Sequence, residues 1–356
     1  MVKKRIQSVQ NQLNHNEAVI ITGDANRRYF TGFASSAGTL LITSHSADFI
    51  IDFRYYEKAY NSISHCNVVL AEKLYMQLRE LLKNNNISKI YTETSYISLK
   101  DFETFRTELS DFEVSSESKM DEYVLELRSI KSDEELKAIK EAQKITDDTF
   151  GYILERIKPG RTEREIMLDM EFFLRKQGSQ GVSFDFIVVS GKNSSLPHGV
   201  PTDKIIESGD FVTMDFGAVV NGYRSDMTRT IAVTSISEEQ RYVYNSVLEA
   251  QNEAFKAIHP GTRCIDVDSA ARNYIYSKGY EGCFGHGLGH SIGIEVHESP
   301  CFNTRDRTIL KPGMILSVEP GIYLPEKFGV RIEDLVCITE DGFENITKSP
   351  KELIIL

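Results

Sequence analysis

The fold of the second half of this chain depends on the stretch Met214-Asp215-Phe216-Gly217-Ala218-Val219-Val220-Asn221-Gly222-Tyr223-Arg224-Ser225-Asp226-Met227-Thr228. At its centre, Asn221-Gly222 tolerates the positive φ angles that a type I′ turn requires. Residues that favour strands stand on both sides of this pair. The stretch is therefore predicted to form a β-hairpin in which Val220 pairs with Tyr223.

The two aspartates of this hairpin are predicted to be neighbours. Counting outward from the turn sets Asp215 opposite Thr228 and Asp226 two residues from that partner, and side chains alternate along a strand with a period of two. A four-residue loop keeps this register, whereas a three-residue loop without a bulge breaks it. A pair of solvated aspartates is the ordinary alternative. Buried together, the two carboxylates repel each other unless a cation lies between them, and one or two divalent metals are the natural candidates.

Composition limits the classes of protein that need to be considered. The chain has 356 residues, of which 41% are hydrophobic and 26% charged, as is usual for a globular protein. Its length predicts two domains. The 41 basic and 52 acidic residues give a net charge of −11, which argues against nucleic-acid and membrane partners. Small or neutral partners are expected instead.

Targeting and redox features predict a cytoplasmic protein. The basic segment 1–5 is followed by polar residues rather than by the apolar region of a signal peptide. No apolar run approaches the ~20 residues needed to span a bilayer. The five cysteines are scattered and form no CxxC pair, so reduced thiols are expected rather than disulfides or a zinc site.

Residues 1–125 are predicted to form an α/β domain, because short β-rich runs alternate with helical patterns. This part of the chain has no phosphate-binding loop and no nucleophile motif. We therefore expect it to shape the substrate site or to support oligomerisation. The predicted strands are 18–22, 38–42, 48–52 and 89–91, and the predicted helices are 54–60, 72–83 and 98–109.

The second domain is predicted to span residues 126–356 and to contain an internal duplication. Ser132 followed by Glu135 has the pattern of a capping box that opens a long helix. The segment 157–162 is echoed by 258–263, and each is followed by a helix that reaches a glycine at the same distance. The run that ends at Asp215 is likewise matched by the run that ends at Glu319. Chance similarity is the alternative. Three matching segments in the same order instead predict two helix-helix-strand-strand halves related by a pseudo-twofold axis.

A second pair of carboxylates follows in chain order. Glu319 ends one predicted strand, and Arg331 and Glu333 share one face of the next. The position of Glu333 relative to Glu319 is then predicted to match that of Asp226 relative to Asp215. Both halves would thus supply carboxylates to one centre. An exposed ion pair between Arg331 and Glu333 is the alternative.

Three of the eight histidines fall within the glycine-rich segment 284–300. The spacing of His286 and His290 suggests a zinc-binding helix face, but the surrounding glycines disfavour a helix and the HExxH glutamate is absent. An extended segment that presents His286, His290 and His297 to a site is favoured over isolated core or surface histidines.

Four carboxylates and a histidine form an oxygen-rich ligand set. Such a set suits Mn²⁺, Co²⁺ or Zn²⁺ in a two-metal centre with the ions about 3.5–4 Å apart. A centre of this kind lowers the pKa of a bridging water and polarises a carbonyl group, so hydrolysis is the expected chemistry. Ligand type alone leaves phosphoester hydrolysis open.

The same residues resemble the prolidase and aminopeptidase P family of pita-bread metallopeptidases. The N-terminal residues Asn26, 29–33 and 52–55 resemble the creatinase-like domain of that family. The resemblance covers nearly the whole chain and implies an α/β creatinase-like domain followed by an α+β pita-bread catalytic domain. The matching motifs of the second domain are Leu196-Pro197-His198-Gly199, Gly289-His290, Val296-His297-Glu298-Ser299-Pro300, Ser317-Val318-Glu319-Pro320-Gly321 and Val330-Arg331-Ile332-Glu333-Asp334.

The resemblance implies the metal ligands. Asp226 and His290 would chelate one ion, Asp215 and Glu333 would bridge two, and Glu319 would complete the set and accept a proton from the water as a general base. Two divalent ions per chain are implied, with Mn²⁺ preferred to Co²⁺ or Zn²⁺.

The resemblance also implies roles for four further residues. His198 and His297 would contact the substrate carbonyl and stabilise the tetrahedral intermediate. His286 would be a further active-site histidine, and Arg331 would orient the bridging glutamate.

The implied substrates are small peptides with proline at the second position, whose tertiary amide has no N–H. Chain length and a compact N-terminal domain favour an Xaa-Pro dipeptidase, with aminopeptidase P on longer peptides as the close alternative. Arg305 or Arg307 could hold the proline carboxylate of a dipeptide. The family plan also implies a homodimer.

Three other classes share the pita-bread core. The added N-terminal domain argues against methionine aminopeptidases. Creatinase is metal-free, and the full ligand set argues against it. A non-catalytic binding module would have lost ligands, and this chain has lost none of the five positions.

Overall fold

The computed structural model describes residues 2–356, and the chain divides into two compact units, one ending at Arg128 and one beginning at Ser129. The sequence predicts this division between residues 125 and 126. Among the helices of residues 2–356, we find none whose length and apolar character would allow it to traverse a bilayer.

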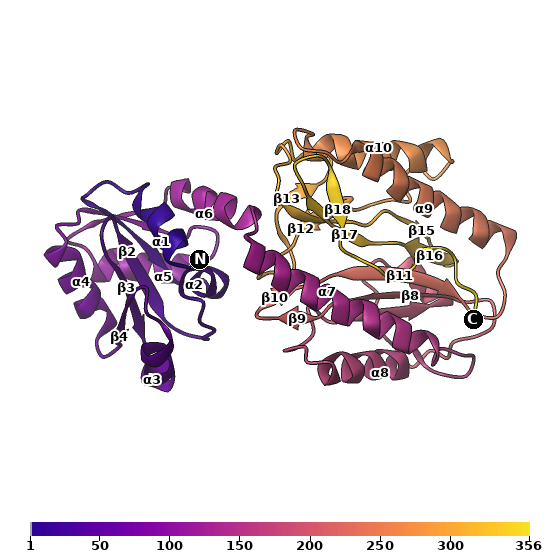
Figure 1. The fold of residues 1–356 in the computed structure, drawn as a ribbon, viewed down its shortest axis with the longest axis horizontal. Helices are drawn as coiled ribbons and strands as arrows, with labels where there is room; N and C mark the ends of the chain where they lie inside the picture. Colours follow the sequence, from indigo (N-terminus) through magenta and orange to yellow (C-terminus); the bar gives the residue numbers. More distant parts are fainter. Residues whose placement is uncertain (1) are drawn as a thin grey trace. The chain divides into compact units, whose positions relative to one another are not determined.

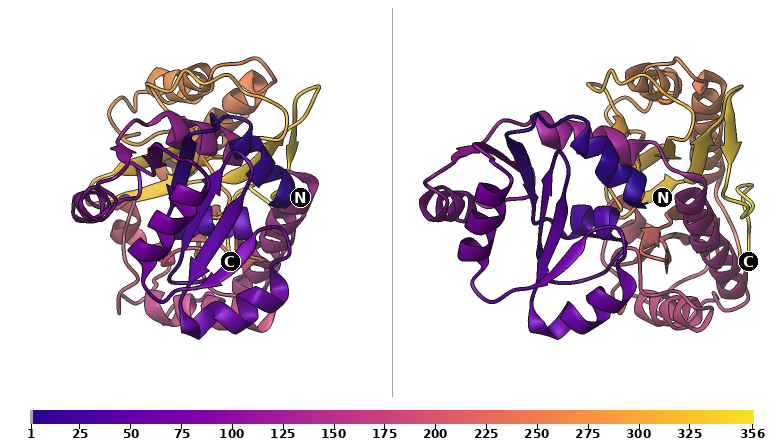
Figure 2. Two further views of the ribbon diagram at one scale, coloured as in Figure 1. Left: turned by 90° about the vertical axis from the view of Figure 1, so that its left-hand side faces the viewer. Right: turned by 60° about the vertical axis from the view of Figure 1, so that its left-hand side comes forward.

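The first unit is a six-stranded sheet with helices on both sides (Figure 2). Strand β1 (Glu17–Ile21) lies inside the sheet, antiparallel to β2 and parallel to β5. All its residues are buried, which explains why it reads as a continuous apolar run rather than an alternating one. The other strands are β2 (Thr39–Thr43), β3 (Ala47–Ile51), β4 (Asn67–Leu70), β5 (Lys89–Thr92) and β6 (Glu113–Ser115), and the helices are α1 (Val2–Gln10), α2 (Asp24–Thr31), α3 (Phe53–Ser62), α4 (Leu74–Asn84), α5 (Leu99–Glu108) and α6 (Lys119–Ser129).

The second unit packs two helix pairs against short antiparallel strands. The α7–α8 pair and the α9–α10 pair lie on different sides of the strands (Figure 1). The helices are α7 (Asp133–Leu154), α8 (Glu163–Lys176), α9 (Glu238–Ala257) and α10 (Cys264–Ser277), with a 3₁₀ helix at Gly191–Ser195. The strands are β7 (Ile187–Ser190), β8 (Phe211–Phe216), β9 (Val219–Val220), β10 (Tyr223–Arg224), β11 (Met227–Ala232), β12 (Gly289–Ser291), β13 (Glu298–Phe302), β14 (Ile315–Val318), β15 (Gly321–Leu324), β16 (Phe328–Arg331), β17 (Asp334–Ile338) and β18 (Phe343–Asn345).

The hairpin predicted from residues 214–228 is present in the predicted register. Val220 lies opposite Tyr223, and Asp215 lies opposite Thr228. Asn221 and Gly222 have φ angles of 50° and 77°, which are the left-handed values of a type I′ turn. The register set by this turn therefore places Asp215 and Asp226 near each other, as predicted.

The predicted duplication is visible in backbone hydrogen bonds. The amides of Gly160 and Gly261 donate to the carbonyls of Ile206 and Leu310, both at 3.0 Å. The amides of Ile206 and Leu310 return bonds of 2.8 Å to the residue after each glycine. Each half has its own core, one joining α7 and α8 to β8 and β11 and the other joining α9 and α10 to β14. The two halves thus build the same pattern around the centre of the unit.

The two carboxylate pairs are not equivalent, contrary to the prediction. Val318 pairs with Asp334, and continuing that register one residue sets Glu319 directly opposite Glu333. Asp226, in contrast, is two residues from the partner of Asp215. The difference arises because Leu324 pairs with Phe328 across a three-residue loop, and the register that this loop sets continues through β14 and β17.

Candidate metal centre

All the predicted site residues line one cavity of about 1250 Å³ in the second unit. Arg305 also lines this cavity, whereas Arg307 is not among the described residues that do. The cavity therefore contains every residue type that the proposed hydrolysis needs. The predicted residues on its wall are Asp215, Asp226, His290, Glu319 and Glu333, together with His198, His286, His297 and Arg331.

The ends of short strands bring the five predicted ligands together. Three of them flank strands: Asp226 precedes β11, Glu319 follows β14 and Glu333 precedes β17. His290 lies in β12, which can approach β14 closely because residue 289 is glycine. A Cβ at Gly289 would lie 2.0 Å from the carbonyl oxygen of Ser317, so any other residue would force these strands apart.

Three carboxylate oxygens in the cavity have no hydrogen-bond partner. They are Oδ1 of Asp215, Oδ1 of Asp226 and Oε1 of Glu333, and all three are buried. One ligand atom each from Asp226, His290 and Glu333 lies within 4.8 Å of the other two. Buried polar atoms in native proteins are nearly always paired, so these oxygens fit coordination of a cation.

The tautomer of His290 also fits a cation. Its Nδ1 atom lies 3.0 Å from the carbonyl oxygen of Ser291, which can only accept, so Nδ1 carries the proton. Nε2 then presents a lone pair to the cavity, 3.7 Å from Oδ2 of Asp226 and 3.5 Å from Oε1 of Glu319. A backbone carbonyl on the far nitrogen is the arrangement that orients histidines for metal binding.

One oxygen each of Asp215, Glu333 and Glu319 is held by a neighbouring side chain. Arg331 donates from Nη2 to Oδ2 of Asp215 at 2.7 Å, Thr228 donates to Oε2 of Glu333 at 2.8 Å, and Ser317 donates to Oε1 of Glu319 at 3.2 Å. Each carboxylate is thus fixed by one oxygen. For Asp215 and Glu333, the other oxygen is the unpaired one described above.

Electrostatics explain why a cation is needed. Burial and the charges of Glu333 and Asp215 raise the pKa of Asp226 well above its usual value. Burial, together with Glu319 and Asp215, does the same for the pKa of Glu333. Burial also raises the pKa of Glu319 to about 8, and it lowers the pKa of His290 to about 4. Without metal, burial favours the protonated forms of Asp226, Glu333 and Glu319, while the His290 imidazole is neutral and can coordinate an ion.

Arg331 has a different partner from the one expected. Arg331 is predicted to orient Glu333, but its guanidinium forms an ion pair with Asp215 instead. It reaches Glu333 only through Thr228, to whose hydroxyl oxygen Nε donates at 3.0 Å. Thr228 is missed in the sequence analysis, although strand alternation places it on the same face as Asp226.

His198 and His297 lie at exposed positions on the cavity wall. The ring of His297 stands 4.3 Å from that of His290, edge to face. Partial burial and then the neighbouring His198 lower the pKa of His297. Both rings are therefore accessible to a bound molecule.

His286 is less available than its position suggests. Nδ1 lies 2.8 Å from the carbonyl oxygen of Gly287, so it carries the proton, and Nε2 accepts from the Tyr323 hydroxyl at 2.9 Å. That hydroxyl in turn accepts from Nη1 of Arg331 at 2.8 Å. Tyr323 is also missed in the sequence analysis, because it lies on the unexpected β15–β16 hairpin.

Comparison with known proteins gives matches along the whole chain. Residues 137–340 match metallopeptidase family M24, and residues 5–130 match the Creatinase/Prolidase N-terminal domain. The uncharacterised peptidase YqhT of Bacillus subtilis is 44% identical over 96% of both chains. Among solved structures, an Xaa-Pro dipeptidase from Bacillus anthracis is 42% identical over all of both chains, with a TM-score of 0.95. An X-Pro aminopeptidase from Thermotoga maritima is 35% identical over 98% of this chain and 99% of that one, with a TM-score of 0.90. These matches agree with the predicted fold, an α/β creatinase-like domain followed by an α+β pita-bread domain.

Proposed function

This chain belongs to metallopeptidase family M24, and from that premise we propose that it is an Xaa-Pro dipeptidase. It would hydrolyse the bond between a first residue and a following proline. The observation that carries the proposal is the convergence of the His290 lone pair and three unpaired carboxylate oxygens in one cavity. Similarity to an Xaa-Pro dipeptidase along the full chain supports the choice of substrate.

We propose that two divalent ions bind here, with Mn²⁺ preferred to Co²⁺ or Zn²⁺. When bound, such ions supply a nucleophilic water and polarise the scissile carbonyl. The proposed ligands are Asp226 with His290 on one ion, Asp215 and Glu333 between the two, and Glu319. The unpaired oxygens and the hard character of carboxylate ligands support this assignment.

The proposed roles of the protein groups follow from their hydrogen bonds. Oε1 of Glu319 accepts from Ser317, so the proton of the attacking water would pass to Oε2. The protonated nitrogens of His198 and His297 would donate to the substrate carbonyl oxygen as it gains charge. Arg331 and Tyr323 would hold Asp215 and His286 in place.

A second candidate is an X-Pro aminopeptidase that acts on longer peptides. The specific observation in its favour is the similarity to the Thermotoga maritima enzyme, which is nearly as extensive as that to the dipeptidase. The two activities differ in whether the proline carboxylate is free. Arg305, which lies on the cavity wall, is the group we propose to bind that carboxylate.

Hydrolysis of Ala-Pro and Ala-Pro-Ala by metal-stripped protein tests both candidates. Mn²⁺, Co²⁺ or Zn²⁺ would be added back separately. Metal-dependent cleavage of Ala-Pro alone is expected for the dipeptidase, and preference for Ala-Pro-Ala would favour the aminopeptidase. Failure to cleave either peptide with any metal would contradict both and favour a binding module.

We further propose that the protein acts as a cytoplasmic homodimer. In this proposal residues 1–125 shape the substrate site or the subunit contact, and residues 126–356 carry the chemistry. The match to a Creatinase/Prolidase N-terminal domain supports a role shared with that family. Light scattering on the purified protein measures its mass in solution, and a monomer would contradict the dimer.

A further inference from the structure

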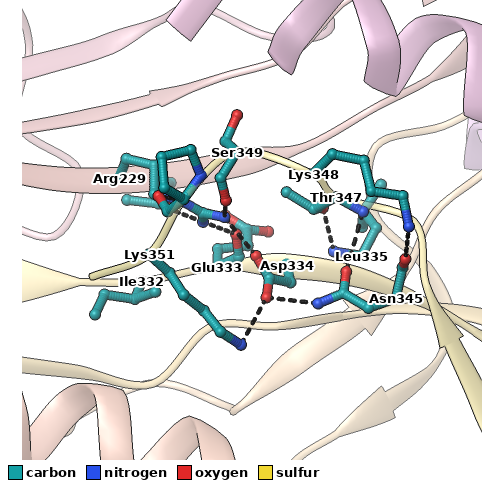
Figure 3. A network of polar contacts seen from close by, with 12 residues as sticks. Arg229, Ile332, Glu333, Asp334, Leu335, Asn345, Thr347, Lys348, Ser349 and Lys351 are labelled. Carbon is teal, nitrogen blue, oxygen red and sulfur yellow. Dashed lines mark hydrogen bonds and ion pairs between the residues drawn. The ribbon is translucent and has the colours of Figure 1, made fainter. Parts of the chain in front are cut away.

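Arg229 is buried behind the metal centre and uses all its N–H groups (Figure 3). Nη2 donates to Oδ1 of Asp334 at 2.7 Å and to the carbonyl oxygen of Ser349 at 2.8 Å, and Nε donates to that of Pro350 at 2.9 Å. Nη1 donates to the carbonyl oxygens of Glu333 at 2.6 Å and Thr228 at 3.0 Å. A side chain this large is rarely buried unless each donor has a partner.

The position of Arg229 relates it directly to a proposed ligand. The Thr228 hydroxyl group donates to Oε2 of Glu333, while the amide of Glu333 donates to the carbonyl of Thr228 at 3.0 Å. Arg229 follows Thr228 and Asp334 follows Glu333, so the Arg229–Asp334 pair lies on the opposite face of the same two chain segments. Nη1 therefore donates to the backbone carbonyls of both Thr228 and Glu333. These carbonyls lie behind the hydrogen bond from Thr228 that orients the Glu333 carboxylate.

A strap of the chain, residues 345–351, completes this arrangement. Oδ2 of Asp334 accepts from Nδ2 of Asn345 at 2.8 Å and from Nζ of Lys351 at 3.2 Å. The strap is anchored on its other side by Asp147 of α7, which accepts from the Ser349 amide at 2.8 Å. Figure 3 shows the side chains of Arg229, Asn345 and Lys351 meeting around Asp334. The backbone of the proposed ligand is therefore tied through Arg229 to a segment that does not touch the cavity.

We propose that Arg229 is a positioning residue that, with Asp334 and the strap, sets the affinity of the centre for its divalent ions. The inference rests on the proposed function in one respect, namely that Glu333 is a ligand. A bridging carboxylate must hold its oxygens within a narrow range of positions, and partners behind the ligands are what fix such positions. Loss of the hydrogen bond from Arg229 to the Glu333 carbonyl would widen the range of positions open to the Glu333 carboxylate. It would not remove any ligand atom.

Arg229→Lys is the first test. Lysine keeps the charge, but its three donors cannot serve five acceptors in a planar fork. The Kd for Mn²⁺, measured by competition with a fluorescent chelator, is expected to rise about 10–100-fold. Turnover of Ala-Pro is expected to recover when excess Mn²⁺ is added, because every group that contacts the substrate remains. Asp334→Asn, which keeps shape but removes the ion pair, is expected to act in the same direction and serves if Arg229→Lys does not fold.

Two control variants distinguish an effect on the position of Glu333 from a general loss of stability. Lys351→Met removes the contacts of Nζ with Asp334 and Gln251 but keeps the hydrogen bonds of Arg229 to the strap carbonyls. It is therefore expected to leave the Kd close to that of the parent. Leu174→Ala opens a cavity in the core of α8 and lowers the melting temperature without touching the network. An unchanged Kd in both Arg229→Lys and Asp334→Asn would overturn the proposal, as would an equal loss of affinity in Leu174→Ala.

The parent protein separates this inference from the proposed function. If it binds Mn²⁺ but cleaves neither peptide, the proposed substrate is wrong while the Kd series still tests Arg229. If it binds none of the metals, both proposals are overturned.

Discussion

Nε2 of His290 lies 3.5 Å from Oε1 of Glu319, and with Glu319 ionised both atoms direct lone pairs at each other. Nδ1 of the histidine already holds its proton against the carbonyl of Ser291. The contact is therefore favourable only with a cation or an additional proton between the two atoms. Metal and protons therefore compete for the space between these two atoms, and the first prediction follows from that competition.

The metal-free protein is expected to lose stability as the pH rises from about 6.5 to about 8. Burial raises the pKa of Glu319 from 4.5 to about 8, and the pKa values of Asp226 and Glu333 are also raised. Below about pH 6.5 the lowered pKa values of His286 and His290 act in the opposite direction. Above it the folded state binds more protons than the unfolded state, so the free energy of unfolding falls as pH rises. Melting temperatures of EDTA-treated protein across the window measure this trend.

The metal-loaded protein provides the comparison. Metal replaces the protons, so the increase in melting temperature caused by Mn²⁺ is expected to grow with pH. A metal-free melting temperature that stays constant or rises from about pH 6.5 to about pH 8 would contradict the raised pKa values.

Substitution of a proposed ligand is expected to remove activity but not the fold. Asp226→Asn and His290→Ala should each lower kcat/KM by more than about 100-fold, since even residues behind metal ligands cost 10–100-fold. Circular dichroism should remain that of the parent, because neither change opens a large cavity. Asp341→Asn, an exposed aspartate of the same unit, is the matched control. Activity of either ligand variant within tenfold of the parent would refute the ligand assignment.

His297→Ala is expected to slow turnover by about 10²–10³-fold if the imidazole stabilises the oxyanion. Metal affinity should change little, since the ring contacts His290 only edge to face. Steady-state kinetics and a Mn²⁺ titration separate these effects. His259, exposed in the same unit, supplies the control variant His259→Ala. An unchanged kcat in His297→Ala would show that this histidine is structural.

Arg305→Gln is expected to raise KM for Ala-Pro with little change in kcat, because the lost charge binds the substrate carboxylate equally in the ground and transition states. For Ala-Pro-Ala, whose proline carboxylate is not free, the change should be smaller. Arg307→Gln is a closely matched control, since Arg307 is exposed nearby but does not line the cavity. Equal KM changes for both peptides would show that Arg305 does not bind the proline carboxylate.

Local chemistry made much of this structure predictable. The Asn221-Gly222 turn fixes the register of the first hairpin, and the glycine-rich context of His290 argues for an extended strand rather than a helix. Both predictions are confirmed. Arg331 shows where such reasoning stops, because its alternation with Glu333 is right while its partner, Asp215, lies on a distant strand.

Partners that depend on tertiary contacts could not be predicted. Tyr323 is missed because the sequence patterns predict no strand at Gly321–Leu324, and only the pairing of this segment with Phe328–Arg331 brings its hydroxyl to Arg331 and His286. The same hairpin makes Glu333 face Glu319 directly rather than diagonally. A motif fixes which residue types occur in a site, but the packing of long-range segments decides which atoms meet.

The division of the ligands between two structural halves has a consequence for biosynthesis. A ribosome completes Asp215 and Asp226 well before it reaches His290, Glu319 and Glu333. The early hairpin then presents two carboxylates that would repel each other if buried, so it is expected to remain hydrated and open during translation. The proposed five-ligand centre cannot be complete until residue 333 has been made, so ion uptake at this centre would report that both halves have come together.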